Sequence, residues 1–217
     1  MHYSYLLFDL DGTIIDSSEG IINCVKYALD DAGLAYPPDE KLLGFIGPPL
    51  VEGFQSVTGM NEQDALAATI KYRERYETEG LYECQLYEGI SSLIKDLHEK
   101  GYHICLATSK PELFARRILE HFELINYFDE IVGATFDGKI NAKDTVIREM
   151  FKRLALTDDR KAETIMIGDR KHDILGAKSC GIDSLGVYYG FAPAGEHEAC
   201  GADYIVDTVE DLRRFFL

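Results

Sequence analysis

Short apolar runs recur along the chain, and a helical pattern follows most of them. The clearest run, Tyr3–Phe8, ends abruptly at Asp9 and indicates a buried strand. Further runs of this kind are His103–Ala107, Thr164–Ile167 and Ser184–Tyr188, with weaker ones at Glu130–Val132 and Tyr204–Val206. The helical patterns are Ile90–Lys100, Pro111–His121, Lys143–Leu154, Ile174–Cys180 and Val209–Phe215. This alternation predicts an α/β fold with a Rossmann-like parallel sheet, covered by helices on both faces.

One long segment, from about Ser17 to Glu83, breaks the alternation because it shows helical spacing and no convincing strand. Its expected helices are Ser17–Gly33, Pro48–Val57 and Asn61–Glu79, with turns expected at Pro37-Pro38 and Gly44–Pro49. We therefore predict an α/β core formed by residues 1–16 and 84–217, and an all-helical cap domain, residues 17–83, inserted after the first strand. Because ligands of parallel sheets bind beyond the carboxyl ends of the strands, we expect the cap next to the site.

The chain is strongly acidic. Its 217 residues include 38 Asp and Glu but only 22 Lys and Arg, which gives a formal net charge of −16. Such a surface repels phosphate backbones and anionic lipids, so we expect neither nucleic acid nor membrane as a partner. A small phosphorylated metabolite remains compatible, because a metal ion or a lysine can reverse the field inside a cleft. The sequence predicts no particular oligomeric state.

The five cysteines are odd in number and form no C-x-x-C pair, so we expect free thiols rather than disulfides or a zinc site. The first residues, Met1-His2-Tyr3-Ser4, lack the basic region and long apolar stretch of a signal peptide. No apolar run approaches the roughly 20 residues that a membrane span requires. Together these features favour a cytoplasmic location.

Candidate chemistry begins directly after the first strand, at Asp9-Leu10-Asp11-Gly12-Thr13. Two carboxylates separated by one residue at a strand end can meet one reacting group from two sides, one as nucleophile and metal ligand and the other moving a proton. The alternative is an ordinary Asp-Gly turn with two solvated acids. A calcium-binding loop is excluded, because Gly20 stands where that loop needs a bidentate glutamate.

A second polar cluster, Thr108-Ser109-Lys110-Pro111, follows the strand expected at His103–Ala107. Its hydroxyls and backbone amides lead into a helix, where the helix dipole and unsatisfied N–H groups can bind an anion. Pro111 suits the first turn of that helix, since its missing N–H is not needed there. An ordinary helix N-cap formed by Ser or Thr remains the competing interpretation.

Two further candidates follow later in the chain. Lys143 lies near the start of an expected helix, where its charge could neutralise phosphoryl oxygens and keep Asp9 ionised, although lone lysines are usually surface residues. Asp169 follows the strand Thr164–Ile167 and could complete a Mg²⁺ site with Asp9, since Mg²⁺ prefers oxygen ligands. Asp173 lies one helical turn further and could brace the site, or it could simply cap a helix.

Taken together, these four clusters and their order resemble the haloacid dehalogenase-like superfamily, whose motifs are D-x-D-x-T, a Thr or Ser after the second strand, a Lys, and G-D-x-x-x-D. The resemblance covers essentially the whole chain, and the helical insertion is similar to a C1 cap. It implies that Asp9 is the nucleophile and a Mg²⁺ ligand, and that Asp11 is the general acid/base and a backbone ligand. By the same resemblance, Asp169 is the remaining protein ligand of Mg²⁺. Phosphate would be bound by Thr108, Ser109 and Lys143, and the site would be supported from behind by Thr13 and Asp173.

The resemblance implies a Mg²⁺-dependent phosphatase that hydrolyses a small phosphomonoester through an aspartyl-phosphate. An acid at position 11 favours phosphoryl transfer over dehalogenation, because the dehalogenases of the superfamily lack it. Three segments are similar to phosphoglycolate phosphatases and bacterial 5′-nucleotidase-like proteins: Thr108–Pro111, Gly47-Pro48-Pro49 and Gly168-Asp169-Arg170. Ser109 departs from the Asn that is more usual in the former, which leaves the substrate open.

Alternative functions remain. A sugar-phosphate mutase of the same superfamily would share every core motif and would isomerise its substrate instead of releasing phosphate. A phospho-receiver signalling domain also uses an acidic Mg²⁺ pocket and a Lys, but its phosphorylated Asp lies on a later strand and it has no helical cap. A non-catalytic binding protein is disfavoured, because every motif position keeps its reactive group.

Overall fold

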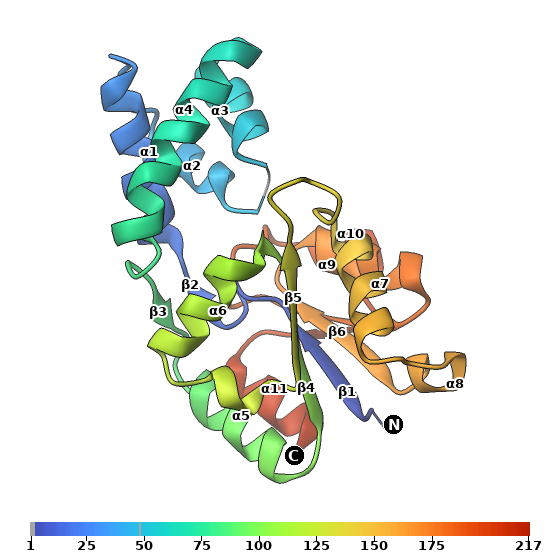
Figure 1. The fold of residues 1–217 in the computed structure, drawn as a ribbon. Helices are drawn as coiled ribbons and strands as arrows, with labels where there is room; N and C mark the ends of the chain where they lie inside the picture. The colour runs from blue at the N-terminus through green and yellow to red at the C-terminus, as the bar shows by residue number, and fades with distance from the viewer. Residues whose placement is uncertain (1–2, 48) are drawn as a thin grey trace. The chain divides into compact units, whose positions relative to one another are not determined.

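The computed structural model describes residues 3–47 and 49–217. Met1, His2 and Pro48 lie outside the described residues. The first two belong to the N-terminal residues considered above for a signal peptide, and Pro48 belongs to the expected Gly44–Pro49 turn. The chain divides into two compact units. One comprises the residues up to Ile15 together with Leu86–Leu217, and the other comprises Asp16–Gln85 (Figure 1).

The larger unit is built on a six-stranded sheet with the order β5-β4-β1-β6-β7-β8, in which all neighbouring strands run parallel. The strands are β1 (Tyr5–Phe8), β4 (His103–Pro111), β5 (Glu130–Ala134), β6 (Thr164–Gly168), β7 (Asp183–Val187) and β8 (Tyr204–Val206). Each of the six apolar runs singled out in the sequence forms one of these strands, so the α/β Rossmann-like expectation is confirmed. β1 lies between β4 and β6, which places the start of the chain in the middle of the sheet.

Helices flank this sheet (Figure 1). They are α5 (Ile90–Glu99), α6 (Glu112–His121), α7 (Lys143–Arg153), α8 (Asp158–Lys161), α9 (Lys171–Cys180), α10 (Glu196–Cys200) and α11 (Val209–Phe216), with a short 3₁₀ turn, η3, at Ile125–Tyr127. α7 packs against α9, and α5 packs against α11. Between the sheet, α7 and α9 lies a buried apolar cluster that includes Leu7, Val132, Ile147, Met150 and Met166. Strands buried in this way need continuous apolar sequence, which is why the strand signals were clear.

The unit Asp16–Gln85 is helical. Its elements are α1 (Ser18–Asp31), α2 (Asp39–Leu42), α3 (Leu50–Thr58) and α4 (Glu62–Arg75), with a 3₁₀ turn, η1, at Leu43–Phe45 and a π-helical turn, η2, at Tyr76–Gly80. α4 packs against both α1 and α3. Arg75, the last residue of α4, makes two hydrogen bonds of 2.7 Å with the Glu83 carboxylate and so connects the end of α4 to the end of the unit. Two short strands, β2 (Ile15–Asp16) and β3 (Gln85–Leu86), pair with each other where the chain enters and leaves the unit.

The end of β4 differs from the sequence expectation. We expected the strand to end at Ala107 and Pro111 to lie in the first turn of the next helix. Instead β4 continues to Pro111, and α6 begins at Glu112. The pairing of β4 with β5 shifts register between Ala107 and Pro111, so the segment Thr108–Lys110 forms an irregular stretch inside the strand. Proline is tolerated at such irregularities because no ladder hydrogen bond from its nitrogen is required.

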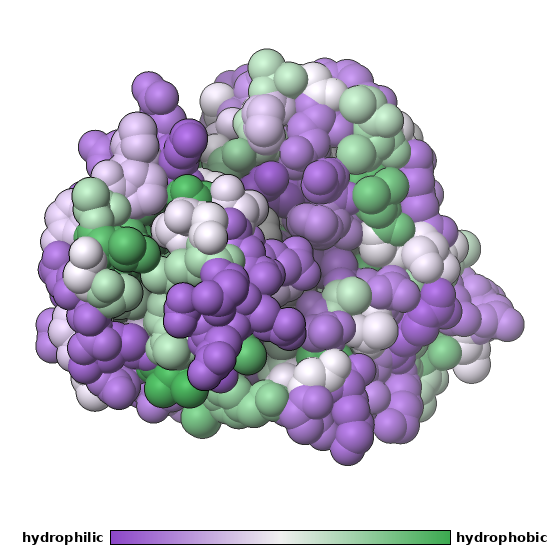
Figure 2. Space-filling model, turned by 90° about the horizontal axis from the view of Figure 1, so that it is seen from above, coloured by the Kyte–Doolittle hydropathy of each residue, from purple (hydrophilic) through white to green (hydrophobic). Residues whose placement is uncertain are grey.

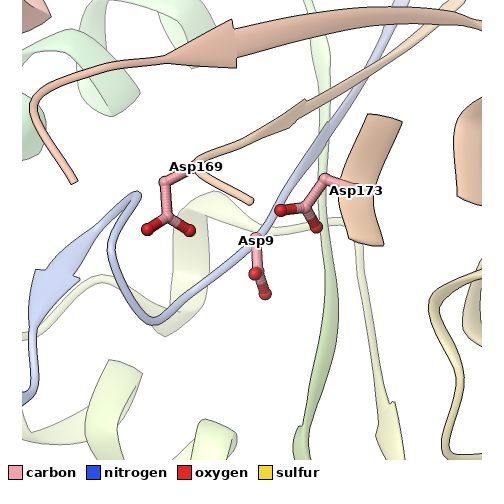
Figure 3. Close-up of side chains that lie close together, drawn as sticks. All are labelled: Asp9, Asp169 and Asp173. Carbon is pink, nitrogen blue, oxygen red and sulfur yellow. The ribbon is translucent and has the colours of Figure 1, made fainter. Parts of the chain in front are cut away.

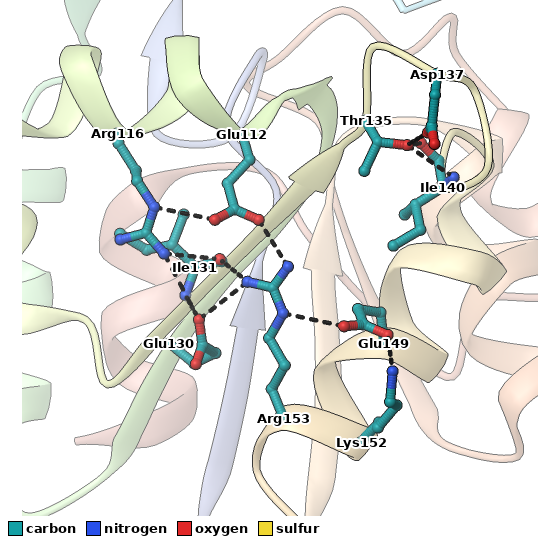
Figure 4. A network of polar contacts seen from close by, with 10 residues as sticks. All are labelled: Glu112, Arg116, Glu130, Ile131, Thr135, Asp137, Ile140, Glu149, Lys152 and Arg153. Carbon is teal, nitrogen blue, oxygen red and sulfur yellow. Dashed lines mark hydrogen bonds and ion pairs between the residues drawn. The ribbon is translucent and has the colours of Figure 1, made fainter.

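The outer edge of β5 is covered by charged side chains (Figure 4). The Ile131 carbonyl accepts hydrogen bonds from Arg116 at 3.2 Å and from Arg153 at 3.1 Å, and the Ile131 N–H donates to the Glu130 carboxylate at 2.9 Å. Arg153 also contacts Glu112 at 3.0 Å and Glu149 at 3.2 Å. This network joins α6, β5 and α7 and satisfies backbone groups that an edge strand otherwise leaves open to other chains.

The sequence also predicted free cysteines and no membrane span. None of the five cysteines forms a disulfide, all of them lying in the described part of the chain. Within residues 3–47 and 49–217, no helix combines the length and the apolar character needed to cross a bilayer. The face drawn in Figure 2 is mainly hydrophilic, with hydrophobic residues in scattered patches, as the high content of charged residues leads one to expect.

Candidate active site

Three carboxylates gather at the carboxyl edge of the central strands (Figure 3). Asp9 follows β1 and Asp169 follows β6, and these strands are neighbours, with the Asp9 N–H donating to the Ile167 carbonyl at 2.9 Å. Asp173 comes from the first turn of α9. One oxygen of each carboxylate lies within 4.8 Å of the others. Strand order and parallel direction therefore bring together acids that are far apart in the sequence.

Lys143, the first residue of α7, lies among these acids. Its Nζ is 2.9 Å from Oδ1 of Asp9, 2.8 Å from Oδ1 of Asp173 and 2.9 Å from the carbonyl of Ala107 at the end of the regular part of β4. The residue is only 4% exposed. A charged lysine is rarely buried unless it is paired, so this position is specific and not that of a surface residue.

Burial and neighbouring charges shift the pKa values of Asp9, Asp169 and Lys143. Burial raises the pKa of Asp9 to about 6, although Lys143 acts against this shift. Burial, with the charges of Asp173 and Asp9, raises the pKa of Asp169 well above its ordinary value. Burial alone would lower the pKa of Lys143, but Asp173 and Asp9 raise it above the usual value, so the lysine stays charged. Lys143 lowers the pKa of Asp9 and so favours its ionised form, but burial acts in the opposite direction and is the larger of the two effects.

The loop after β1 turns sharply beneath Asp169. The Leu10 N–H donates to Oδ1 of Asp9 at 2.8 Å, and the Leu10 carbonyl accepts from the N–H groups of Ile14 and Ile15. Gly12 has φ +79°, and a Cβ atom there would lie 2.0 Å from Oδ2 of Asp169. Only glycine allows both the turn and this close approach.

Asp11 is not part of the three-carboxylate cluster. Its side chain forms an ion pair with Lys110, whose Nζ lies 2.8 and 2.9 Å from the two carboxylate oxygens. Lys110 is buried, and the sequence interpretation assigned it no role beyond membership of the Thr108–Pro111 run. The sequence did single out Lys110 in one respect, because it is a cation three residues beyond the last residue of the expected strand. Its pairing with Asp11 follows only from the structure, in which β4 lies beside β1.

The remaining candidates lie close to these residues. Thr108 is buried, and its Oγ1 accepts the Lys110 N–H at 3.2 Å, while Ser109 is half-buried. Thr13 is fully buried, and its Oγ1 has no hydrogen-bond partner among the described residues. Asp173 accepts the Arg170 N–H at 3.0 Å, so it caps α9 and contacts Lys143 at the same time. The helix begins at Lys171, earlier than the expected Ile174, because of this cap.

The donor set fits a hard divalent cation. Asp169 is fully buried, and its Oδ1 has no hydrogen-bond partner within the part of the chain that the structure describes. A buried carboxylate oxygen in this state costs free energy unless a ligand satisfies it. Asp173 already contacts Lys143 and the Arg170 N–H, so Asp9 and Asp169 are the better candidates for coordination. Oxygen ligands of this type suit Mg²⁺.

Most of the chain matches the model of a protein family. The model of the family described as haloacid dehalogenase-like hydrolase matches residues 6–187, which include all the candidate residues above. The match therefore covers most of the chain and spans both structural units.

Individual proteins are similar over nearly the full length. A 5′-nucleotidase of Pseudomonas aeruginosa is 40% identical over 199 residues, covering 92% of this chain and 89% of that protein. The tyrosine-protein kinase PtkA of Mycobacterium tuberculosis is 34% identical, covering 96% of this chain and 70% of that protein. Among solved structures, one described as a predicted phosphatase from Clostridium acetobutylicum has a TM-score of 0.91 and 41% identity, covering 99% of this chain and 98% of that one.

Proposed function

This chain belongs to the haloacid dehalogenase-like hydrolase family, and we propose that it is a Mg²⁺-dependent phosphatase acting on a small phosphomonoester. As a phosphoric monoester hydrolase it would form an aspartyl-phosphate on Asp9. The likeness to a 5′-nucleotidase makes nucleoside 5′-monophosphates the first substrate class to test, with phosphoglycolate as the second.

One observation carries this proposal: Asp9, at the end of β1, lies 2.9 Å from the buried Nζ of Lys143 and close to the carboxylate of Asp169. A nucleophilic carboxylate beside a cation and a second acid is the arrangement that phosphoryl transfer requires. Thr108 and Ser109, on the neighbouring strand β4, are the groups we assign to the phosphate.

A divalent cation would be held by Asp9, Asp169 and the backbone carbonyl of Asp11, and when bound it would offset charge on the phosphoryl oxygens. The buried Oδ1 of Asp169 favours this assignment, because no described residue hydrogen bonds to it. Thr13 and Asp173 would support the ligands from behind. Lys143, whose Nζ lies 2.9 Å from Oδ1 of Asp9, would share the task of charge compensation.

The reaction we propose has two steps. In the first, an oxygen of Asp9 forms a bond to phosphorus, the bond from phosphorus to the leaving oxygen breaks, and Asp11 gives that oxygen a proton. In the second, water attacks phosphorus, Asp11 accepts a proton from the water, and the bond from phosphorus to Asp9 breaks. Lys110 contacts both oxygens of the Asp11 carboxylate, so we assign it the role of orienting Asp11 toward the leaving oxygen.

We assign substrate selection to the helical unit Asp16–Gln85, which we propose to be a cap domain of the C1 type. The clustered residues of the larger unit would contact the phosphate group and the metal ion. Because every phosphomonoester has the phosphate group, these contacts would not distinguish one substrate from another. A sugar-phosphate mutase is the alternative function, because a sugar phosphate could take the place of water in the second step.

The test is phosphate release from a panel of nucleoside 5′-monophosphates, 2-phosphoglycolate, sugar phosphates and pyrophosphate, with Mg²⁺ or with EDTA. We expect release with Mg²⁺, and a loss of release with EDTA or in Asp9→Asn. The matched control is Asp158→Asn, which removes a carboxylate that pairs with Lys161 on α8. Near-normal turnover by Asp9→Asn would contradict the mechanism.

Two outcomes would redirect the function without changing the site. Isomerisation of a sugar phosphate without phosphate release would favour the mutase. Transfer of the terminal phosphoryl group of an added nucleoside triphosphate to a tyrosine peptide, with release of the nucleoside diphosphate, would favour the activity named for the mycobacterial relative. Both are measured in the same reactions, by product analysis of the sugar phosphate and of an added tyrosine peptide.

A further inference from the structure

The segment Tyr189–Phe191, which follows β7 and Tyr188, contacts the site at two points. The Tyr189 hydroxyl donates a hydrogen bond to the Thr13 carbonyl at 3.0 Å, across 176 residues of sequence. The Phe191 N–H donates to Oδ2 of Asp169 at 2.7 Å, across 22 residues. One short turn therefore holds both the loop after β1 and the acid after β6.

The Phe191 hydrogen bond determines which oxygen of Asp169 remains available. Oδ2 accepts the Phe191 N–H, whereas Oδ1 is buried and has no hydrogen-bond partner among the described residues. A side chain fixed through one oxygen keeps the other in a constant direction. An Asp169 side chain held in this way would lose little further side-chain entropy on binding a ligand through Oδ1.

Gly190 makes this arrangement possible. A Cβ atom at Gly190 would lie 2.2 Å from the Gly12 carbonyl oxygen and 2.5 Å from Cβ of Asp169. Both contacts are shorter than real Cβ atoms show, and one of them is to backbone, which cannot easily move. A side chain at this position would push the loop after β1 and Asp169 apart.

The Tyr189 ring is itself held in place. It packs edge-on against the Tyr87 ring, with ring centroids 5.0 Å apart. The Tyr87 N–H donates to the Ile14 carbonyl at 3.1 Å, so Tyr87 is also fixed to the loop after β1. The Tyr189 hydroxyl therefore reaches the Thr13 carbonyl from a defined position.

We propose that Tyr189, Gly190 and Phe191 form a positioning turn that sets the affinity of the Asp9–Asp169 site for its divalent cation. This inference rests on the proposed function, because it assumes that Asp169 is a metal ligand. The turn lies after the last of the four motifs, and its hydrogen bonds reach the Thr13 carbonyl and the Asp169 carboxylate, not the nucleophile we assign to Asp9. Groups that orient metal ligands typically change metal affinity by ~10–100-fold when they are removed.

The test measures the Mg²⁺ dissociation constant by isothermal titration calorimetry, without substrate, for the full chain and its variants. We expect Gly190→Ala to bind Mg²⁺ ~10–100-fold more weakly, and Tyr189→Phe to weaken binding in the same direction by a smaller factor. The matched control is Tyr188→Phe, whose hydroxyl contacts Glu198 and the Gly195 N–H and whose loss should leave the constant unchanged. In Tyr189→Phe, turnover should recover at high Mg²⁺ concentration, which a purely structural defect would not allow.

The variant Asp169→Asn distinguishes a failure of the positioning turn from a failure of the proposed metal site. If this variant loses Mg²⁺ binding while Gly190→Ala and Tyr189→Phe bind like the parent, the positioning turn is wrong and the proposed function stands. If Asp169→Asn itself binds Mg²⁺ like the parent, the proposed metal site is wrong, and the role proposed for the turn is wrong as well. Circular dichroism in EDTA reports folding, and Tyr189→Phe alone decides the question if Gly190→Ala does not fold.

Discussion

Lys110 and Asp11 form a two-point ion pair that links β4 to the loop after β1. The Lys110 Nζ lies 2.8 Å from one oxygen of the Asp11 carboxylate and 2.9 Å from the other, across 99 residues of sequence. Asp11 is thereby held away from the Asp9, Asp169 and Asp173 cluster, although it is only two residues from Asp9. The two acids of the D-x-D motif thus pair with different lysines, Asp9 with Lys143 and Asp11 with Lys110.

The first prediction concerns this pair. Replacing Lys110 with Met removes the cation that orients Asp11, so proton transfer to the leaving oxygen should become slower. We expect kcat to fall by ~10²-fold, the lower end of what general acid–base catalysis contributes. The Mg²⁺ dissociation constant should change little, because the lysine that pairs with Asp9 and Asp173 is Lys143. The control is Lys152→Met, which removes an exposed lysine on α7; a normal kcat in Lys110→Met would contradict the prediction.

Lys143 should matter for both turnover and folding. Its removal in Lys143→Met leaves Asp9 and Asp173 buried without their cation. We expect kcat to fall by ~10²–10³-fold, as for the loss of other groups that stabilise developing charge. Urea unfolding at pH 7.5 should show a loss of ~3–5 kcal/mol, the usual cost of an uncompensated buried charge. A variant as stable as the parent would show that the acids are not charged in the folded protein.

A pH dependence follows from Asp9. Its pKa is raised to about 6 in the absence of metal, mainly by burial. Below that pH the carboxyl group is protonated and neutral, so protons compete with the cation; above it, the ionised group is available as ligand and nucleophile. We therefore expect the Mg²⁺ concentration for half-maximal activity to rise as the pH falls below about 6.

The measurement is a series of Mg²⁺ titrations between pH 5 and 8, with phosphate release as the readout and calorimetric Mg²⁺ binding as a second readout. A Mg²⁺ requirement that stays constant across this range would contradict the prediction. Asp158→Asn serves again as the control, and its profile should coincide with that of the parent.

The network on the edge of β5 should contribute to stability. Arg153 contacts Glu112, Glu130 and Glu149 and donates to the Ile131 carbonyl. We expect Arg153→Met to reduce the free energy of unfolding by ~1–3 kcal/mol, since hydrogen bonds to charged groups are lost from half-buried partners. The exposed Arg148 on α7 provides the control, and Arg148→Met should cost less than ~0.5 kcal/mol.

The same network predicts an acid sensitivity. Burial by itself would raise the pKa of Glu112, but Arg153 and Arg116 lower it below the ordinary value. A depressed pKa contributes stability above the unfolded-state pKa, and this contribution is lost as the pH falls through the folded-state pKa. The stability difference between the parent and Arg153→Met should therefore shrink in acid, below the ordinary titration range of glutamate. A difference that is independent of pH would contradict the role given to the Glu112 charge.

The sequence by itself determined the strands of the α/β core and the residues that follow them. Parallel strands buried on both faces require continuous apolar runs, and Tyr3–Phe8 and Thr164–Ile167 were legible for that reason. Since the carboxyl ends of such strands share one edge, Asp9 and Asp169 could be expected to meet before any coordinates were known.

Tertiary structure alone decided the contacts between these residues. The pairing of Lys110 with Asp11 depends on β4 lying beside β1, and the sequence does not state the strand order. The hydrogen bonds of Tyr189 and Phe191 depend on a turn after β7 that has no motif of its own. Likewise, the contact of Asp173 with Lys143 depends on the packing of α7 on α9, whereas its helix cap is local and was one of the sequence interpretations. Local spacing specifies each strand end, but side-chain partners across the sheet follow from packing over long distances in the sequence.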